Sequence, residues 1–116
     1  MEIFVKRASL EDAKNVASLF NDYRVFYKQE SDITVALEFI SERLDKNESV
    51  IFFAQDAKGV LLGFTQLYPN FSSVSAKRSG ILNDLYVASA ARRLGVARKL
   101  MNAAKDFAIS TDGKGI

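Results

Sequence analysis

The most informative stretch of this chain reads ILNDLYVASAARRLGVA and runs from Ile81 to Ala97. Its first part, Ile81 to Val87, is largely apolar on both faces, which is typical of a strand in the centre of a sheet. Ala88 to Leu94 leaves that strand, and a helix is predicted from Gly95 onward. The buried face of this helix is expected to carry Val96, Leu100, Ala103, Ala104 and Phe107.

The basic loop between the predicted strand and helix has the features of an anion site. Unpaired N–H groups in the first turn of a helix can donate to phosphate oxygens, and the helix dipole adds about half a positive charge. Gly95 and Ala97 leave room for a phosphate to approach, and Arg92, Arg93 and Arg98 add positive charge. The loop is therefore predicted to bind a pyrophosphate.

Upstream of this stretch, the pattern predicts one short strand and two helices. Glu2 to Arg7 alternates as a strand does, and Ser9-Leu10-Glu11-Asp12 then offers a helix cap with an acidic first turn. Apolar residues recur at helical spacing in two segments, the first of which runs to about Tyr27. The buried stripes consist of Ala13, Val16, Ala17, Phe20 and Tyr23 in the first helix and of Ile33, Leu37, Ile40 and Leu44 in the second.

A hairpin of two strands is predicted next. Ser49 to Gln55 and Val60 to Tyr68 are rich in β-branched and aromatic residues, and Asp56 to Gly59 has the composition of a hairpin turn. Pro69 to Ser75 is expected to be a loop. The phenylalanines of this region, Phe52, Phe53, Phe64 and Phe71, are expected to pack in the core.

The resulting order, β-α-α-β-β-β-α, predicts an α/β or α+β fold in which sequential strands pair and helices cover the sheet. The length of 116 residues suits a single domain, taken as residues 1–116. A strand-to-helix unit normally returns to the sheet through another strand, and Ile116 stands where that strand should begin. We therefore expect a domain that is incomplete at its C-terminus, or a sheet completed by another chain.

Composition excludes several classes of chemistry. The chain has no cysteine and no histidine, so it offers no disulfide, no thiol nucleophile and no imidazole base or metal ligand. No metal site is expected. The apolar runs are too short to span a bilayer and the N-terminus lacks a signal-peptide pattern, so a cytoplasmic protein without a membrane partner is predicted.

Charge is distributed unevenly along the chain. Residues 1–76 carry 8 basic and 11 acidic side chains, whereas residues 77–116 carry 8 basic and 3 acidic ones, a net charge of +5. An anionic partner would be attracted to the C-terminal third, whether a nucleotide cofactor, a nucleic acid or a membrane surface. Charge alone does not choose between these partners, but a nucleic-acid-binding domain ranks last among the functions considered, because no recognised nucleic-acid-binding motif is present.

The loop matches the pattern Gln/Arg-x-x-Gly-x-Gly/Ala of the GNAT superfamily of N-acetyltransferases, and Arg92 to Ala97 resembles its pyrophosphate loop. Ile81 to Val87 resembles the fourth strand of that family, and the resemblance covers essentially the whole chain. It implies a mixed, mostly antiparallel sheet flanked by helices and truncated before the fifth strand. It also implies transfer of acetyl from acetyl-CoA to a primary amine of a small molecule or peptide.

The resemblance implies a set of cofactor-binding residues. In relatives, the strand backbone pairs with the pantetheine arm, a role that would fall on Leu85 and Val87, and amides from Arg93 to Arg98 would hold the pyrophosphate. The full set implied in this way is Leu85, Tyr86, Val87, Arg92, Arg93, Leu94, Gly95, Val96, Ala97 and Arg98.

The catalytic residues stay open at this point. A polyamine-acetylating branch of the family carries Glu-Asp where this chain has Asn83-Asp84, and an asparagine cannot act as a base. Asp84 lies on the opposite face of the strand from Asn83 and is either a base or, in the favoured reading, a structural hydrogen-bond acceptor. The tyrosine that acts as the acid in relatives lies on a later helix, beyond this sequence.

The binding site for the acceptor amine is predicted near the end of the first helix. The segment from Asn21 to Tyr27 resembles a region of bacterial GNAT proteins where the acceptor often binds, which makes Arg24 and Tyr27 substrate candidates. In the alternative interpretation, Tyr23 and Phe26 belong to the core and Arg24 is solvated.

Two further hypotheses follow from the resemblance. Loss of the strand glutamate and the missing tyrosine leave open a non-catalytic acyl-CoA-binding sensor or interaction module. The sheet edge left by the missing fifth strand favours a homodimer, formed by pairing or strand exchange at that edge.

Overall fold

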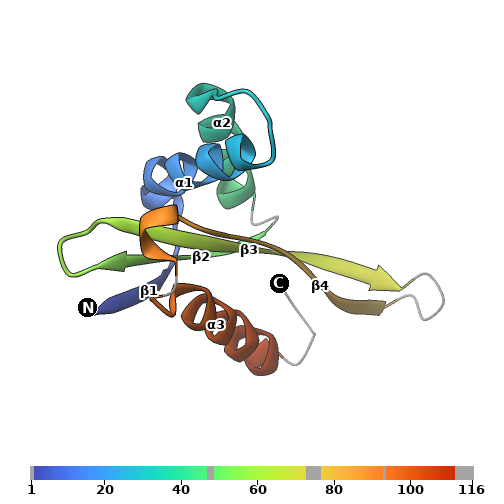
Figure 1. Cartoon of the computed structure of the whole chain (residues 1–116). Coiled ribbons are helices and arrows are strands. Elements are labelled where there is room, and N and C mark those ends of the chain that lie inside the picture. Colours follow the sequence, from blue (N-terminus) through green and yellow to red (C-terminus); the bar gives the residue numbers. More distant parts are fainter. Residues whose placement is uncertain (1, 47–48, 73–76, 93, 112–116) are drawn as a thin grey trace.

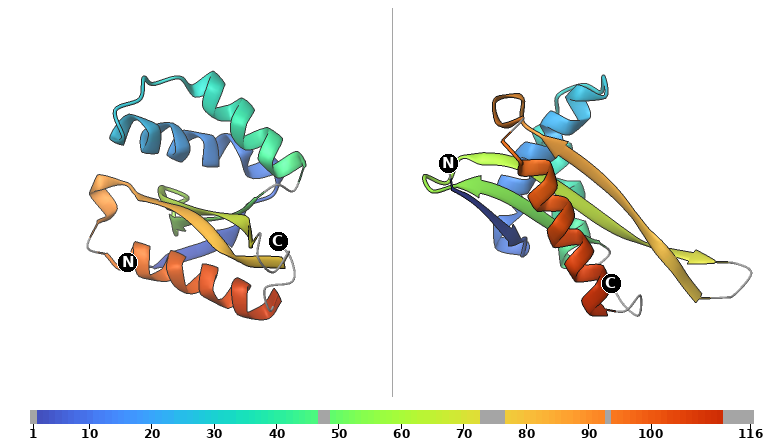
Figure 2. Two further views of the ribbon diagram at one scale, coloured as in Figure 1. Left: turned by 90° about the vertical axis from the view of Figure 1, so that its right-hand side faces the viewer. Right: turned by 60° about the horizontal axis from the view of Figure 1, so that its bottom comes forward.

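The computed structural model describes residues 2–46, 49–72, 77–92 and 94–111. These residues form a four-stranded antiparallel sheet in the order β1-β2-β3-β4, together with three α-helices. Helices α1 and α2 lie on one face of the sheet and α3 lies on the other (Figures 1 and 2). The predicted fold class and the predicted order of elements are confirmed.

The strands are β1 (Ile3–Arg7), β2 (Val50–Asp56), β3 (Leu61–Ser72) and β4 (Lys77–Val87), and the helices are α1 (Ala13–Phe26), α2 (Ile33–Asp45) and α3 (Val96–Thr111). Two short 3-10 turns, η1 (Leu10–Asp12) and η2 (Ser89–Ala91), precede α1 and α3.

The cap predicted at Ser9 is present, but the residues after Ser9 first form the 3-10 turn η1 and only then helix α1. The Asp12 carboxylate accepts hydrogen bonds from the Ser9 N–H at 2.9 Å and from the Ser9 hydroxyl at 3.2 Å. Lys6 Nζ lies 3.2 Å from the same carboxylate. This arrangement fixes the path from β1 into α1.

The hairpin formed by β3 and β4 is longer than the sequence suggested. Pro69 to Ser72, predicted as part of a loop, continue β3 and pair with β4, so that prediction is wrong. Pro69 fits in the strand because the register of β2 ends with Val50 opposite Leu67, so the missing N–H breaks no bond to β2. The hairpin extends beyond the helices (Figure 1).

Strand β4 lies at the edge of the described sheet. The prediction that it is a central strand is therefore wrong for the described sheet. Both faces of β4 are apolar because helices cover both faces of the sheet, and not because the strand has a neighbour on each side. Tyr86 packs against the cluster that includes α1, whereas Leu85 and Val87 pack against the cluster that includes α3. Burial by two helix layers therefore produced the pattern typical of a central strand.

Each face of the sheet carries a hydrophobic cluster. On the α1 side, Phe53 and Phe64 are fully buried, as predicted. On the α3 side, Phe52 is half-buried, and its ring centroid lies 6.0 Å from that of Phe107. The side chain of Phe71 lies outside the described residues.

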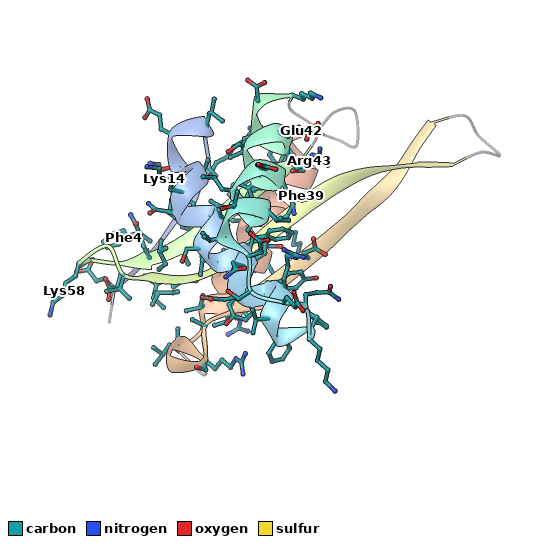
Figure 3. All side chains as sticks on the ribbon, turned by 90° about the horizontal axis from the view of Figure 1, so that it is seen from above. Phe4, Lys14, Phe39, Glu42, Arg43 and Lys58 are labelled. Atoms are coloured by element: carbon teal, nitrogen blue, oxygen red, sulfur yellow. The ribbon has the colours of Figure 1, made fainter. Side chains whose placement is uncertain are left out.

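Helix α2 packs mainly on α1. The rings of Phe39 and Phe20 stack with centroids 5.0 Å apart, and the Arg43 guanidinium lies 4.6 Å from the centroid of Phe39 (Figure 3). Asp32 caps α2 by accepting from the Val35 N–H at 3.1 Å. Among the described residues, no helix combines the length and apolar character needed to cross a membrane.

Candidate functional site

The backbone of β4 has an open edge at Leu85 and Val87. The Ala88 N–H donates to the Leu62 carbonyl at 2.8 Å, so the backbone groups of Ala88 face β3. Because these groups alternate between the two edges of a strand, those of Leu85 and Val87 point away from β3. No described strand lies on that side. An extended ligand can therefore pair with the backbone of β4 along this edge.

The loop after β4 leads directly into the first turn of α3. Gly95 has a φ of +81°, a conformation that glycine adopts without penalty, and its carbonyl accepts from the Lys99 N–H at 3.1 Å. That bond begins the helical ladder. The N–H groups of Val96, Ala97 and Arg98 precede it and thus have no acceptor within the helix.

A pocket of about 330 Å³ lies at this helix start. Its lining consists of Val87, Ala91, Arg92, Gly95, Val96, Ala97 and Arg98. The structure thus brings together six of the ten residues predicted to bind the cofactor and adds Ala91, a buried residue of η2 that the motif did not indicate. Leu94 is exposed, and Arg93 lies outside the described residues.

Arg92 connects this pocket to a second one. Its Nε donates to the Val87 carbonyl at 3.1 Å, and its guanidinium lies 5.1 Å from the ring centroid of Phe26 on α1. The second pocket, of about 290 Å³, also includes Arg92 in its lining. The Arg92 cation can therefore interact electrostatically with ligands in both pockets.

The second pocket lies between the end of α1, β4 and η2. Its lining consists of Asp22, Val25, Phe26, Tyr86, Ser89 and Arg92. Asp22, Val25 and Phe26 share one side of α1 because their spacing is i, i+3 and i+4. This spacing, next to the core stripe of the helix, was the signal in the sequence that could have indicated them.

The substrate candidates chosen from the sequence lie beside this pocket without lining it. Tyr27 is 59% exposed, and its ring packs against Tyr23 at 5.0 Å between centroids. Arg24 is half-buried, and its Nη1 is buried without a hydrogen-bond partner in the described part of the chain. Phe26 is 56% exposed, so its core position in the alternative interpretation is wrong, whereas Tyr23 packs against the core as that interpretation expected.

Tyr86 lies between two opposite charges in the second pocket. Burial raises the pKa of its hydroxyl, and the Asp22 carboxylate raises that pKa further, whereas Arg92 lowers it. The phenol therefore stays protonated at neutral pH and can donate or accept a hydrogen bond.

Asp84 is held by neighbouring side chains. Its Oδ1 accepts from the Tyr23 hydroxyl at 3.0 Å, and Gln66 Nε2 lies 3.5 Å from its Oδ2. Asn83 pairs with Leu67 through the register of β3 and β4, and its side chain lies outside the described residues. The geometry of Asp84 suits the structural role that the sequence favoured for it.

Comparison with known proteins identifies the family. Residues 14–116 match the acetyltransferase (GNAT) family. The chain belongs to the GNAT acetyltransferase family. It is 51% identical over 104 residues to an uncharacterized N-acetyltransferase, YhfO, of Bacillus subtilis (strain 168), and the match covers 90% of this chain and 69% of that protein.

Solved structures agree with this assignment. The crystal structure of a probable acetyltransferase superposes with a TM-score of 0.83 and 44% identity, covering 97% of this chain and 74% of that one. A predicted acetyltransferase with acetyl-CoA from Clostridium acetobutylicum superposes with a TM-score of 0.74 at 12% identity, which shows the shared fold. That match covers 96% of this chain and 76% of the other.

Proposed function

We propose that this protein is an acetyl-CoA-dependent N-acetyltransferase that transfers acetyl to a primary amine of a small molecule or peptide. The observation that carries the proposal is the continuity of two features at Val87. This residue lies on the open edge of β4 and also lines the pocket at the start of α3. One ligand with an extended arm and a pyrophosphate would use both.

The residues of the pocket fit a pyrophosphate. The amides of Val96, Ala97 and Arg98 would donate to its oxygens, and Arg92 and Arg98 would balance its charge. A Cβ built on Gly95 would have no heavy atom within 4 Å, so the space beside this residue is open. The pocket therefore offers both the donors and the room that a pyrophosphate needs.

The edge of β4 would orient the acetyl group. The backbone groups of Leu85 and the N–H of Val87 would pair with the pantetheine arm, while the Val87 carbonyl accepts from Arg92 Nε. An N–H at this edge would donate to the thioester carbonyl oxygen as negative charge develops there. In the proposed reaction, the amine nitrogen bonds to the carbonyl carbon, the carbon–sulfur bond breaks, and coenzyme A leaves as a thiolate that takes up a proton from solvent to become the free thiol. The nitrogen loses a proton to a base or to water.

A second candidate function is binding of acyl-CoA without turnover, as a sensor or interaction module. The observation in its favour is the hydrogen bond from Tyr23 to Asp84, because it engages the strand carboxylate that the sequence offered as a base. The two functions share the cofactor and differ only in thiol release.

Isothermal titration with acetyl-CoA tests the cofactor, and a pair of glycine variants makes the test specific. Gly95 and Gly59 have φ angles of +81° and +84°, and an added Cβ would have no heavy atom within 4 Å at either position. Gly95→Ala and Gly59→Ala therefore carry a similar backbone penalty. Only Gly95→Ala is expected to weaken acetyl-CoA binding, by roughly 10-fold.

Thiol release across a panel of amines then separates the two functions. Acetyl-CoA binding with thiol release above background supports the transferase, whereas binding without release supports the sensor. Absence of acetyl-CoA binding at millimolar concentration would overturn both. The cytoplasmic location, the homodimer at the β4 edge and the reading of residues 1–116 as one incomplete domain stay predictions.

A further inference from the structure

Three residues with polar side chains line the second pocket. These residues are Asp22, Tyr86 and Ser89, and within the described part of the chain neither the Asp22 carboxylate nor the two hydroxyl groups make a hydrogen bond or ion pair. The rings of Phe26 and Tyr86 form an aromatic wall, with centroids 6.1 Å apart. Several groups able to bind an ammonium ion thus lie around one space of about 290 Å³.

The charge of this pocket depends on what Arg92 binds. Asp22 and Arg92 are the charged residues of its lining, and Arg92 also lines the pocket at the start of α3. A pyrophosphate in that neighbouring pocket would neutralise Arg92. Asp22 would then leave the second pocket with a net negative charge, which attracts a cation.

We propose, on the basis of the proposed acetyltransferase function, that this pocket binds a second cationic group of the acceptor, with Asp22 as its anchor. The amine that reacts must be neutral, because only a neutral nitrogen has the lone pair needed for attack. A carboxylate favours the protonated form of whatever amine it binds. Asp22 therefore suits a distal ammonium that stays charged, while the reacting amine lies toward the edge of β4.

The substrate class that follows is an alkyl diamine, or an amine that carries another cation at a similar spacing. The distal ammonium would pair with Asp22 and donate to the hydroxyls of Tyr86 and Ser89, and its methylene groups would lie against Phe26. A monoamine of equal carbon length would make only the apolar contact.

Equilibrium binding tests the proposal without requiring turnover. An alkyl diamine and the monoamine of equal length are titrated calorimetrically into the full chain in the presence of coenzyme A, which has no acetyl group to transfer. We expect the diamine to bind roughly 10-fold more tightly than the monoamine, the size of one charge-assisted hydrogen bond. Asp22→Asn should abolish this difference.

A matched variant controls for charge in general. Glu30 is exposed, lies on the loop after α1 and does not line the pocket. Glu30→Gln removes the same charge and should leave diamine binding unchanged. Equal affinity for diamine and monoamine, or equal effects of Asp22→Asn and Glu30→Gln, would overturn the proposal, as would undetectable diamine binding.

Kinetic measurements give a second test, and they separate the role of Asp22 from the proposed acetyltransferase function. With acetyl-CoA, Asp22→Asn should lower kcat/KM for the diamine by about 10-fold and change the value for the monoamine less than about 2-fold. Retained acetyl-CoA binding with no preference for the diamine overturns the role of Asp22 alone. If the unaltered chain does not bind acetyl-CoA, the proposed function itself is contradicted.

Discussion

The hydroxyl of Tyr23 donates a hydrogen bond to Oδ1 of Asp84 across 3.0 Å, and this bond joins α1 to β4. Further hydrogen bonds connect Asp84 to the interior of the sheet. Gln66 Nε2 lies 3.5 Å from Oδ2 of Asp84, and Gln66 Oε1 accepts from the Ser49 hydroxyl at 2.8 Å. Helix α1 and strand β4 also form two walls of the second pocket. The bond therefore holds these walls in a fixed relation.

The first prediction concerns the pH dependence of stability through Tyr23. Burial and the bond to Asp84 raise its pKa from 10.0 to about 12, so the folded protein favours the neutral phenol. This contribution to the free energy of unfolding is complete below pH 10 and falls as pH rises toward about 12. Urea unfolding across this range should show a steeper decline in the unaltered protein than in Tyr23→Phe. Equal slopes would contradict the assignment.

The second prediction concerns the charge of Arg92. Arg92→Gln keeps much of the side-chain length but removes the cation between the two pockets, so acetyl-CoA should bind about 10-fold more weakly. The loss should shrink at high salt, because salt screens the attraction between Arg92 and the phosphates in the unaltered protein. Lys99→Gln serves as the control, since Lys99 is exposed on α3 and does not line the pocket. Calorimetric titration at two salt concentrations measures both effects, and similar losses in the two variants would argue against a specific contact.

The third prediction concerns close packing between β3 and β4. A Cβ on Gly63 would lie 2.6 Å from the Tyr86 carbonyl oxygen and 3.2 Å from the Val87 Cα, and these backbone atoms cannot move without displacing β4. Gly63→Ala should therefore lower the free energy of unfolding by about 2–3 kcal/mol. Gly59→Ala meets no such atoms and should cost only about 1 kcal/mol for its positive φ. Urea denaturation distinguishes the two, and equal losses would contradict the packing argument.

The fourth prediction concerns the end of α1. Lys28 has a φ of 65°, and the Gln29 and Lys28 N–H groups donate at 2.9 Å to the carbonyls of Arg24 and Val25. This is a Schellman ending, in which glycine normally takes the position of Lys28. Lys28→Gly should raise the free energy of unfolding by about 0.5–1 kcal/mol. Gln29→Gly, at a residue without a positive φ, should give no gain, and thermal or urea unfolding checks both.

Local patterns were sufficient for most of the fold. Helical spacing predicted α1 and α2, because the side chains buried along one helix recur at a period set by its own geometry. The cap formed by Ser9 and Asp12 was predictable for the same reason, since its hydrogen bonds span only three residues. The loop before α3 was recognisable because Gly95 and the flanking basic residues lie next to one another in the chain.

Contacts between distant segments were beyond local patterns. The extension of β3 through Pro69 to Ser72 depends on pairing with β4. The apolar pattern of β4 did not indicate an edge strand, because helices bury both of its faces. Asp22, Phe26 and Ser89 were missed because they meet only when α1 packs beside β4 and η2. The order of residues along the chain was thus sufficient to predict the family and the basic loop before α3, because both are recognised from residues that lie close together in the sequence. The pocket next to that loop arises from packing, because its walls come from elements more than 50 residues apart in sequence.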